Sequence, residues 1–183
     1  NIQLYNEPYG HGHINPIDIC GVIDVPMGEF WVPGMRAGEN VVVISGARVY
    51  GKNIVSAEAF TGDPVTNWKG HPGMWKPAGD HAWSQGVNEF VFHRFVHQAN
   101  THVEPGLTMG HWGSHIDRTQ HWWMNAGKSW FEYLARGSQL LQQGFPVVDV
   151  LVFVGDRSHQ RFVSLDVPPG LNYDCTNADA LIN

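Results

Sequence analysis

Two glutamates, Glu7 and Glu58, each follow a stretch of apolar, strand-like sequence and precede a loop. Hydrolysis of a glycosidic bond needs two carboxyl groups, one protonated to release the sugar oxygen and one ionised to activate water or attack the sugar carbon. Different surroundings hold two such groups in opposite charge states. We therefore predict that Glu7 and Glu58 are catalytic, the alternative being that either is a surface or ion-paired residue. Asp24 and Glu29 are weaker candidates near the same edge.

A second cluster of chemical groups lies between aromatic side chains in the stretch 112–123. Trp112, Trp122 and Trp123 flank Asp117 and Arg118. Aromatic faces stack on sugar rings, and charged side chains make paired hydrogen bonds to hydroxyl groups. We predict that all five bind substrate. An ion pair between Asp117 and Arg118 that closes the loop is an equally good interpretation.

The histidines provide the alternative of a metal-dependent hydrolase. Three pairs have spacings that occur at metal sites: His93 with His97, His111 with His115, and His11 with His13. A spacing of four aligns two imidazoles only on a helix. The first pair begins in a strand-like stretch and the second in a glycine-rich loop, and no His-Glu-x-x-His motif is present. Hydrogen bonding to sugar hydroxyls or to loop backbone is favoured, and we predict His93 and His97 as substrate-binding residues with unknown metal ligands.

The composition excludes several other classes of protein. The 183 residues carry a net charge of −6 without a Lys/Arg cluster, which argues against a nucleic-acid partner. No apolar run is long enough to span a membrane. The two cysteines, Cys20 and Cys175, fit no zinc spacing, and no Gly-x-Ser-x-Gly elbow of a serine hydrolase occurs. Since the chain starts at Asn1 without methionine or signal peptide, we expect it to be part of a longer protein.

The elements that position these residues alternate between strands and helices. We predict strands at 1–10, 52–60, 86–93 and 147–155, a strand end at 24–27, helices at 40–50 and 129–143, and long loops at 61–85 and 97–122. The segment 41–44, Val-Val-Val-Ile, has strand propensity, but a crossover between parallel strands favours a helix there. This order predicts an α/β fold with parallel strands, in which the loops after the strands build the site of a (β/α)8 barrel.

An ordered series of motifs resembles the glycoside hydrolases of family 106, the bacterial α-L-rhamnosidases. The motifs are Asn-Glu-Pro-Tyr-Gly at 6–10, Asp-Val-Pro-Met-Gly-Glu-Phe-Trp at 24–31, Val-Tyr-Gly-Lys at 49–52, Ala-Glu-Ala-Phe-Thr at 57–61, Gly-Val-Asn at 86–88, Phe-His at 92–93, Pro-Gly at 105–106, Met-Gly-His-Trp-Gly at 109–113, Trp-Trp at 122–123, Tyr-Leu-Ala-Arg at 133–136, Gln-Gln-Gly at 142–144 and Asn-Ala-Asp-Ala-Leu at 177–181. No single motif is decisive, but their order along nearly the whole chain is specific.

The resemblance implies a large, secreted or periplasmic, multidomain enzyme that removes terminal α-L-rhamnosyl residues from polysaccharides with inversion, and with calcium in its active site. By the same resemblance, residues 1–144 are the C-terminal part of a partial (β/α)8 TIM-type barrel. Residues 145–183 begin a truncated α/β domain of amidotransferase-like type. The fragment alone is expected to be inactive. Which glutamate is the acid stays open, as do a catalytic carboxylate upstream of Asn1 and a non-catalytic, carbohydrate-binding role.

Overall fold

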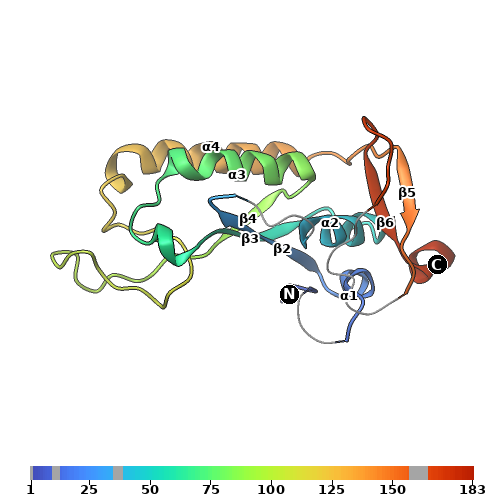
Figure 1. Ribbon diagram of the computed structural model, residues 1–183, viewed down its shortest axis with the longest axis horizontal. Helices are drawn as coiled ribbons and strands as arrows, with labels where there is room; N and C mark the ends of the chain where they lie inside the picture. The colour runs from blue at the N-terminus through green and yellow to red at the C-terminus, as the bar shows by residue number, and fades with distance from the viewer. Residues whose placement is uncertain (1, 10–12, 35–38, 157–164) are drawn as a thin grey trace.

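A four-stranded parallel sheet forms the centre of the chain. The computed structural model describes residues 2–9, 13–34, 39–156 and 165–183 (Figure 1). The strands are β1 (Tyr5–Asn6), β2 (Val25–Val32), β3 (Ser56–Gly62) and β4 (Glu89–Phe92), and they lie in the order β1-β2-β3-β4. All three pairings are parallel, which confirms the predicted sheet type.

A helix follows each of the four strands. They are α1 (Pro16–Val22), α2 (Glu39–Val49), α3 (Pro72–Gln85) and α4 (Lys128–Leu141), with a short 3-10 turn at Pro64–Thr66 and a π-helical turn at Trp123–Gly127. Since parallel neighbours need a crossover, this alternation gives four consecutive strand–helix units. None of the described helices has the length and apolar composition needed to cross a lipid bilayer.

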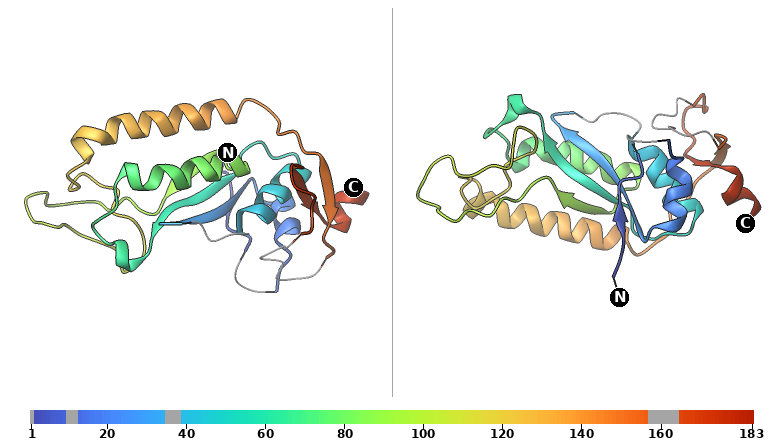
Figure 2. Two further views of the ribbon diagram at one scale, coloured as in Figure 1. Left: turned by 45° about the horizontal axis from the view of Figure 1, so that its top comes forward. Right: turned by 90° about the horizontal axis from the view of Figure 1, so that it is seen from below.

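One face of the sheet is covered by helices and the other is open. Along β2, Phe30 and Val32 are buried, whereas Met27, Glu29 and Trp31 are only half-buried. Because side chains alternate along a strand, the first set points to the helices and the second to the open face. The covered face holds an aromatic core in which Phe60 contacts rings from β2, β4, α3 and α4. Helices α3 and α4 lie side by side along the sheet (Figure 2).

The predicted loop at 61–85 is wrong, because α3 occupies its second half. Pro72, Trp75, Gly79 and Ala82 are buried at helical spacing on one face of α3. Proline is tolerated at the first position of a helix, although Pro77 lies inside it. Glycine at position 79 avoids a tight contact, because a Cβ atom there would lie 3.1 Å from the Phe60 ring. The helix at 40–50 and the helix at 129–143 are confirmed as α2 and α4.

A separate two-stranded parallel sheet follows α4. It consists of β5 (Val150–Phe153) and β6 (Tyr173–Thr176), and α5 (Ala178–Ile182) follows it. The Arg48 guanidinium contacts the Asp174 carboxylate at 3.0 Å and ties this sheet to α2. The strand predicted at 147–155 is shorter than expected, since β5 spans only Val150–Phe153. Leu151 and Phe153 are exposed. The proposed domain boundary near residue 144 stays a prediction.

Candidate active site

Two carboxylates face each other on neighbouring strands of the open face. The register pairs Glu29 of β2 with Glu58 of β3, and Glu58 with Val91 of β4. Paired residues of adjacent strands point to the same side of a sheet, so the two carboxylates share the open face. Glu58 is the third residue of β3, so the prediction that it ends the strand is wrong. Asp24, one of the weaker candidates, accepts a hydrogen bond from the Leu4 N–H at 2.7 Å and precedes β2.

An irregularity in β3 brings Thr61 to the same face as Glu58. Phe60 has a φ of 61°, in the left-handed region that non-glycine residues rarely adopt, and the register with β2 shifts at this point. Thr61 therefore pairs with Trp31, where uninterrupted alternation would point its side chain toward the helices. The Thr61 hydroxyl donates to Glu58 Oε1 at 2.5 Å. The strained residue thus supplies Glu58 with a hydrogen-bond donor.

His93 provides a second donor to Glu58. Its Nδ1 lies 3.2 Å from Glu58 Oε1 and 3.2 Å from the Thr61 hydroxyl. Arg94 Nη1 lies 3.2 Å from His93 Nε2. An arginine N–H only donates, so Nε2 accepts and Nδ1 carries the hydrogen. Burial lowers the pKa of His93, Glu58 raises it and Arg94 lowers it. Because the pKa of His93 is lowered overall, its contact with Glu58 is a hydrogen bond from a neutral imidazole.

Glu29 is held from two sides. The Tyr9 hydroxyl donates to Glu29 Oε2 at 3.1 Å, and the Trp31 indole N–H donates to Glu29 Oε1. The Glu29 backbone N–H donates to Asn40 Oδ1 at 2.9 Å, at the start of α2. Glycine at position 28 is required for this approach, because a Cβ atom there would overlap Asn40 Oδ1. Sequence analysis treated Glu29 as a weak candidate, although the alternation along β2 already places it opposite the helix-facing residues.

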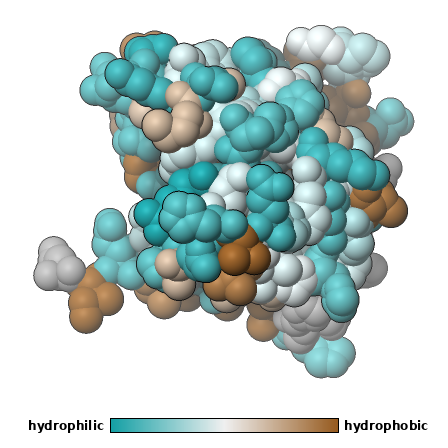
Figure 3. Space-filling model, turned by 90° about the vertical axis from the view of Figure 1, so that its left-hand side faces the viewer, coloured by the Kyte–Doolittle hydropathy of each residue, from teal (hydrophilic) through white to brown (hydrophobic). Residues whose placement is uncertain are grey.

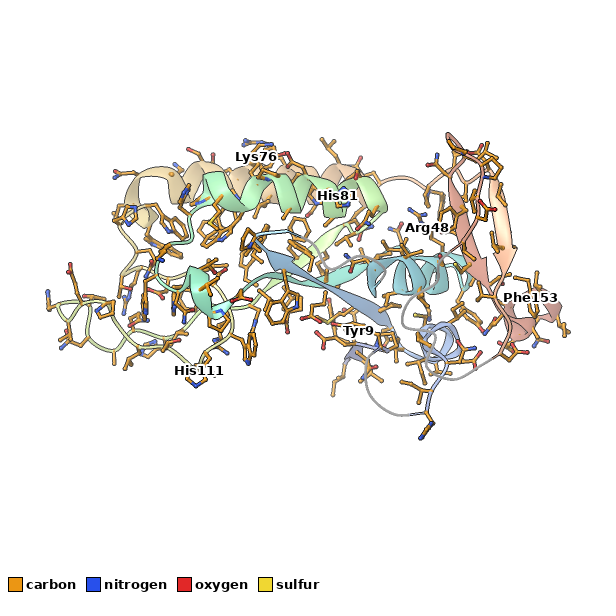
Figure 4. The ribbon with its side chains drawn as sticks, viewed as in Figure 1. Tyr9, Arg48, Lys76, His81, His111 and Phe153 are labelled. Carbon is orange, nitrogen blue, oxygen red and sulfur yellow. The ribbon has the colours of Figure 1, made fainter. Side chains whose placement is uncertain are left out.

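Tyr9 connects all three glutamates. Its ring is buried, and burial is the main reason that the pKa of Tyr9 is strongly raised. The charges of Glu7, Glu29 and Glu58 and the hydrogen bond to Glu29 raise it further. Glu7 directly follows β1 and is exposed. Figure 4 shows Tyr9 beside β2, away from Lys76 and His81 of α3. Tyr9 is a further residue that sequence analysis missed, and it remains a neutral donor among the three carboxylates.

The loop between β4 and α4 contributes an aromatic wall. Trp112 is 50% exposed, and its ring lies edge-to-face on Trp31 with centroids 5.2 Å apart. Arg94 Nη2 donates to the backbone carbonyl of Trp112. Seen from the end where this loop projects, the surface is mainly hydrophilic with isolated hydrophobic patches (Figure 3). His97 is exposed in the same loop. The predicted contribution of Trp112 to a sugar site is compatible with this position.

Other residues predicted to bind substrate lie inside the protein. Asp117 has 0% exposure, and its Oδ1 accepts hydrogen bonds from the Thr119 N–H at 2.8 Å and the Thr119 hydroxyl at 2.6 Å. Trp122 is 4% exposed, lies in the aromatic core and donates to the Gly70 carbonyl. The ring of Trp123 is half-buried against this core. Stacking on a sugar through Trp122, or bonding through Asp117, therefore disagrees with the structure, because both contribute to packing.

Arg118 is placed differently from both interpretations of the sequence. Its guanidinium donates to the backbone carbonyl of Gln98 at 2.7 Å. Among the ion pairs of the described chain, none joins Arg118 to Asp117. Arg118 therefore stabilises the long loop through backbone contacts.

The histidines do not gather at one point. His115 is buried and stacks on Trp68, with ring centroids 3.5 Å apart and planes 4° apart. His111 is exposed (Figure 4), and His13 is exposed near α1. His11 lies outside the described residues. In the part of the chain that the structure covers, no three His, Cys, Asp or Glu side chains are placed to hold a metal ion.

A cavity of about 610 Å³ lies apart from the carboxylates. It is lined by residues that precede β3 and β4 and by the ends of α2, α3 and α4, including Arg48, Trp83, Asn88, Leu140 and Asp174. In parallel α/β folds, ligands bind beyond the carboxyl ends of the strands, and this cavity is at the amino ends. The arrangement around Glu58 is therefore the better candidate for an active site than this cavity.

Comparison with known proteins identifies the family of the chain. The family described as α-L-rhamnosidase, glycoside hydrolase family 106, matches residues 1–183. A protein of Formosa agariphila with the provisional name β-glucuronidase is 38% identical over 169 residues, which cover 92% of this chain and 14% of that protein. The structure of a rhamnosidase from Novosphingobium sp. PP1Y is similar with a TM-score of 0.83 and 28% identity, over 98% of this chain and 18% of that one. The chain thus spans less than a fifth of either relative, and it belongs to the α-L-rhamnosidase family of glycoside hydrolases.

Proposed function

We propose that the protein containing this chain is an α-L-rhamnosidase that hydrolyses terminal α-L-rhamnosyl residues of polysaccharides on the open face of the sheet. The observation that carries the proposal is the pairing of two carboxylates on the open face, with Glu7 at the end of the neighbouring strand β1. Glu29 and Glu58 face each other in register, and Glu7 is close enough to raise the pKa of Tyr9 together with them. Paired carboxyl groups with different surroundings are what glycoside hydrolysis requires.

In the proposed mechanism, Glu58 is the general base and Glu7 the general acid. Thr61 and His93 both donate to Glu58 Oε1, so these two donors hold the carboxylate in place to accept a proton from water. Glu58 removes a proton from water as the water oxygen bonds to the sugar C1. The bond from C1 to the leaving oxygen breaks, and that oxygen takes the proton of Glu7. Inversion requires room for the water, with the carboxyl groups roughly 6.5–9.5 Å apart.

Glu29 has a supporting role in this scheme. Tyr9 and Trp31 both donate to it, so two neutral donors hold its carboxylate oxygens. A fixed negative charge beside the sugar stabilises the positive charge that develops at C1 in the transition state. Glu29 is therefore proposed to stabilise charge, while Glu7 and Glu58 exchange protons with the leaving oxygen and the water.

The charges of the site favour a neutral sugar. A glucuronide carries its own carboxylate, which the charged Glu29 and Glu58 would repel. Rhamnose is uncharged, and its 6-deoxy position presents a methyl group that suits an aromatic surface such as the exposed Trp112 ring. Although one relative is provisionally named a β-glucuronidase, these charges support the rhamnoside.

We also propose that residues 1–144 form half of a (β/α)8 barrel that the rest of the protein closes. The four consecutive strand–helix units support this architecture. Residues 145–183 would begin the following α/β domain, which their separate parallel sheet supports.

Calcium remains a prediction from the family resemblance. Ca²⁺ takes about six to eight oxygen ligands, several of them carboxylates. The described residues do not place three candidate side chains around one point. A calcium ligand set would therefore include residues outside the described part of the chain.

The proposal is tested with the full-length protein on an aryl α-L-rhamnoside and an aryl β-glucuronide. We expect turnover of the rhamnoside alone, and its loss in Glu7→Gln and Glu58→Gln. Glu132→Gln is the matched control, because Glu132 is an exposed glutamate of α4 paired with Lys128 and Arg136 at 3.8 Å. A metal-dependent hydrolase would lose turnover in a chelator and regain it with added zinc. Its turnover would also be abolished by substitution of the histidines. Binding without turnover would support a carbohydrate-binding module and contradict the proposal.

A further inference from the structure

Arg94 holds two parts of the site with one side chain. Nη1 lies 3.2 Å from His93 Nε2, and Nη2 donates to the carbonyl of Trp112. The backbone around it is fixed as well, because the Arg94 N–H donates to the Ser114 carbonyl at 3.0 Å and the Arg94 carbonyl accepts from the Ile116 N–H at 3.3 Å. The guanidinium therefore bridges the start of the loop, beside the carboxylates, and the aromatic wall farther along it.

On the His93 side, Arg94 determines which imidazole nitrogen carries the hydrogen. With Nε2 accepting from Arg94, Nδ1–H points to Glu58 and Thr61. The charged or titratable groups that face His93 are Glu58 from β3 and Arg94 from its own loop, and Thr61 adds a hydroxyl. Without Arg94, either nitrogen could carry the hydrogen, and the donor to Glu58 would no longer be assured.

On the Trp112 side, Arg94 fixes the backbone that presents the exposed ring. The same ring packs on Trp31, whose indole donates to Glu29. Trp112 is thus connected through Trp31 to one carboxylate and through Arg94 and His93 to the other. A sugar that stacks on Trp112 would therefore contact a ring that is linked to both Glu29 and Glu58.

We propose that Arg94 is a positioning residue. It couples binding of the sugar on Trp112 to the orientation of Glu58, which it influences through His93. This inference rests on the proposed function, because it needs Glu58 to act on a sugar. Only arginine has the geometry for it: the planar guanidinium offers separate N–H groups to two acceptors, whereas lysine presents one ammonium at the end of a flexible chain. The two contacts can therefore be separated by substitution.

The test measures kcat and KM against pH for an aryl α-L-rhamnoside with the full-length protein. In Arg94→Gln, loss of the neighbouring positive charge raises the pKa of His93, so the imidazolium forms at higher pH and weakens Glu58 as a base. We expect the acid limb of kcat/KM to move to higher pH and KM to rise. In Arg94→Lys the charge remains but one contact is lost, so KM rises while the acid limb stays near that of the wild type. Arg136→Gln, on the exposed face of α4, leaves both unchanged.

Folded Arg94→Gln protein with the KM and pH profile of the wild type would overturn the inference. If circular dichroism shows that Arg94→Gln does not fold, Arg94→Lys decides, and an unchanged KM overturns the inference. Different outcomes test the proposed function and the positioning role. An inactive wild type, or full activity in Glu58→Gln, counts against the function itself, whereas activity that depends on Glu58 but not on Arg94 counts against the positioning role alone.

Discussion

Replacing Thr61 by valine removes one of the two donors to Glu58 without changing the shape of the side chain. The hydroxyl lies 2.5 Å from Glu58 Oε1, at the short end for a donor to a carboxylate. Hydrogen bonds to charged groups contribute about 1.5–3 kcal/mol. Glu58 is 26% exposed and keeps its contact with His93, so the lower end applies. About 1.4 kcal/mol corresponds to a factor of ten in rate, and we expect kcat/KM to fall by about tenfold in Thr61→Val because Glu58 loses the donor that holds its carboxylate in place.

The assay is kcat/KM on an aryl α-L-rhamnoside at one fixed pH, with two controls. Thr61→Ser keeps the hydroxyl and should keep the wild-type value. Thr66→Val makes the same chemical change at a hydroxyl that donates to the Asp63 carbonyl, away from the carboxylates, and should also leave kcat/KM unchanged. If Thr61→Val and the wild type have the same kcat/KM, the hydrogen bond does not hold Glu58 for catalysis and the reasoning is refuted.

Three further predictions follow from burial and exposure. Trp122→Ala should destabilise the protein by about 3–5 kcal/mol, because it empties part of the aromatic core. Trp112→Ala should raise KM with little change in melting temperature, because this ring is half exposed. Equal melting temperatures for the two variants would contradict this. Burial lowers the pKa of His115, so the unfolded chain binds a proton that the folded chain does not, and the free energy of unfolding should fall as pH drops below about 6.5. His115→Phe keeps the ring on Trp68 and should reduce this fall in a melting series, and a slope equal to that of the wild type would exclude His115 as its source. Residues 1–183 alone should be inactive and bind an apolar dye, since the open sheet face and Leu140, Phe145 and Val147 are exposed; robust rhamnosidase activity of this fragment would disprove it.

The sequence predicted the alternation of strands and helices. Local propensity opposed a helix at α2, where the need for a crossover predicted it correctly, and misled only at α3. Residues 41–44 are β-branched and favour a strand, yet they form α2, because the helix packs these side chains against α1 and the sheet and tertiary burial outweighs propensity. In α3, Pro72 and Pro77 and the glycines suggested a loop. The spacing of Trp75, Gly79 and Ala82 was the signal for a helix, and it becomes clear only when glycine counts as a packing residue.

The candidate site was predictable where it follows strand order and unpredictable where it depends on packing. The sequence placed Glu58 and His93 on adjacent strands, and they lie in contact. The left-handed conformation of Phe60 has no sequence signal, so the position of Thr61 beside Glu58 could not be foreseen. Tryptophan beside charge predicted a sugar site around Trp122, but the same residue type fills cores, and only tertiary packing separates the two uses.

The most direct test of the account is chemical rescue of Glu58→Ala in the full-length protein with an activated aryl α-L-rhamnoside. If Glu58 is the base of an inverting enzyme, the variant loses turnover because no group activates water. Azide, which needs no base, should then restore release of the aryl group and yield the β-configured rhamnosyl azide, identified by NMR. Wild-type turnover in Glu58→Ala without azide, or a rescued product of retained configuration, would contradict the central claim.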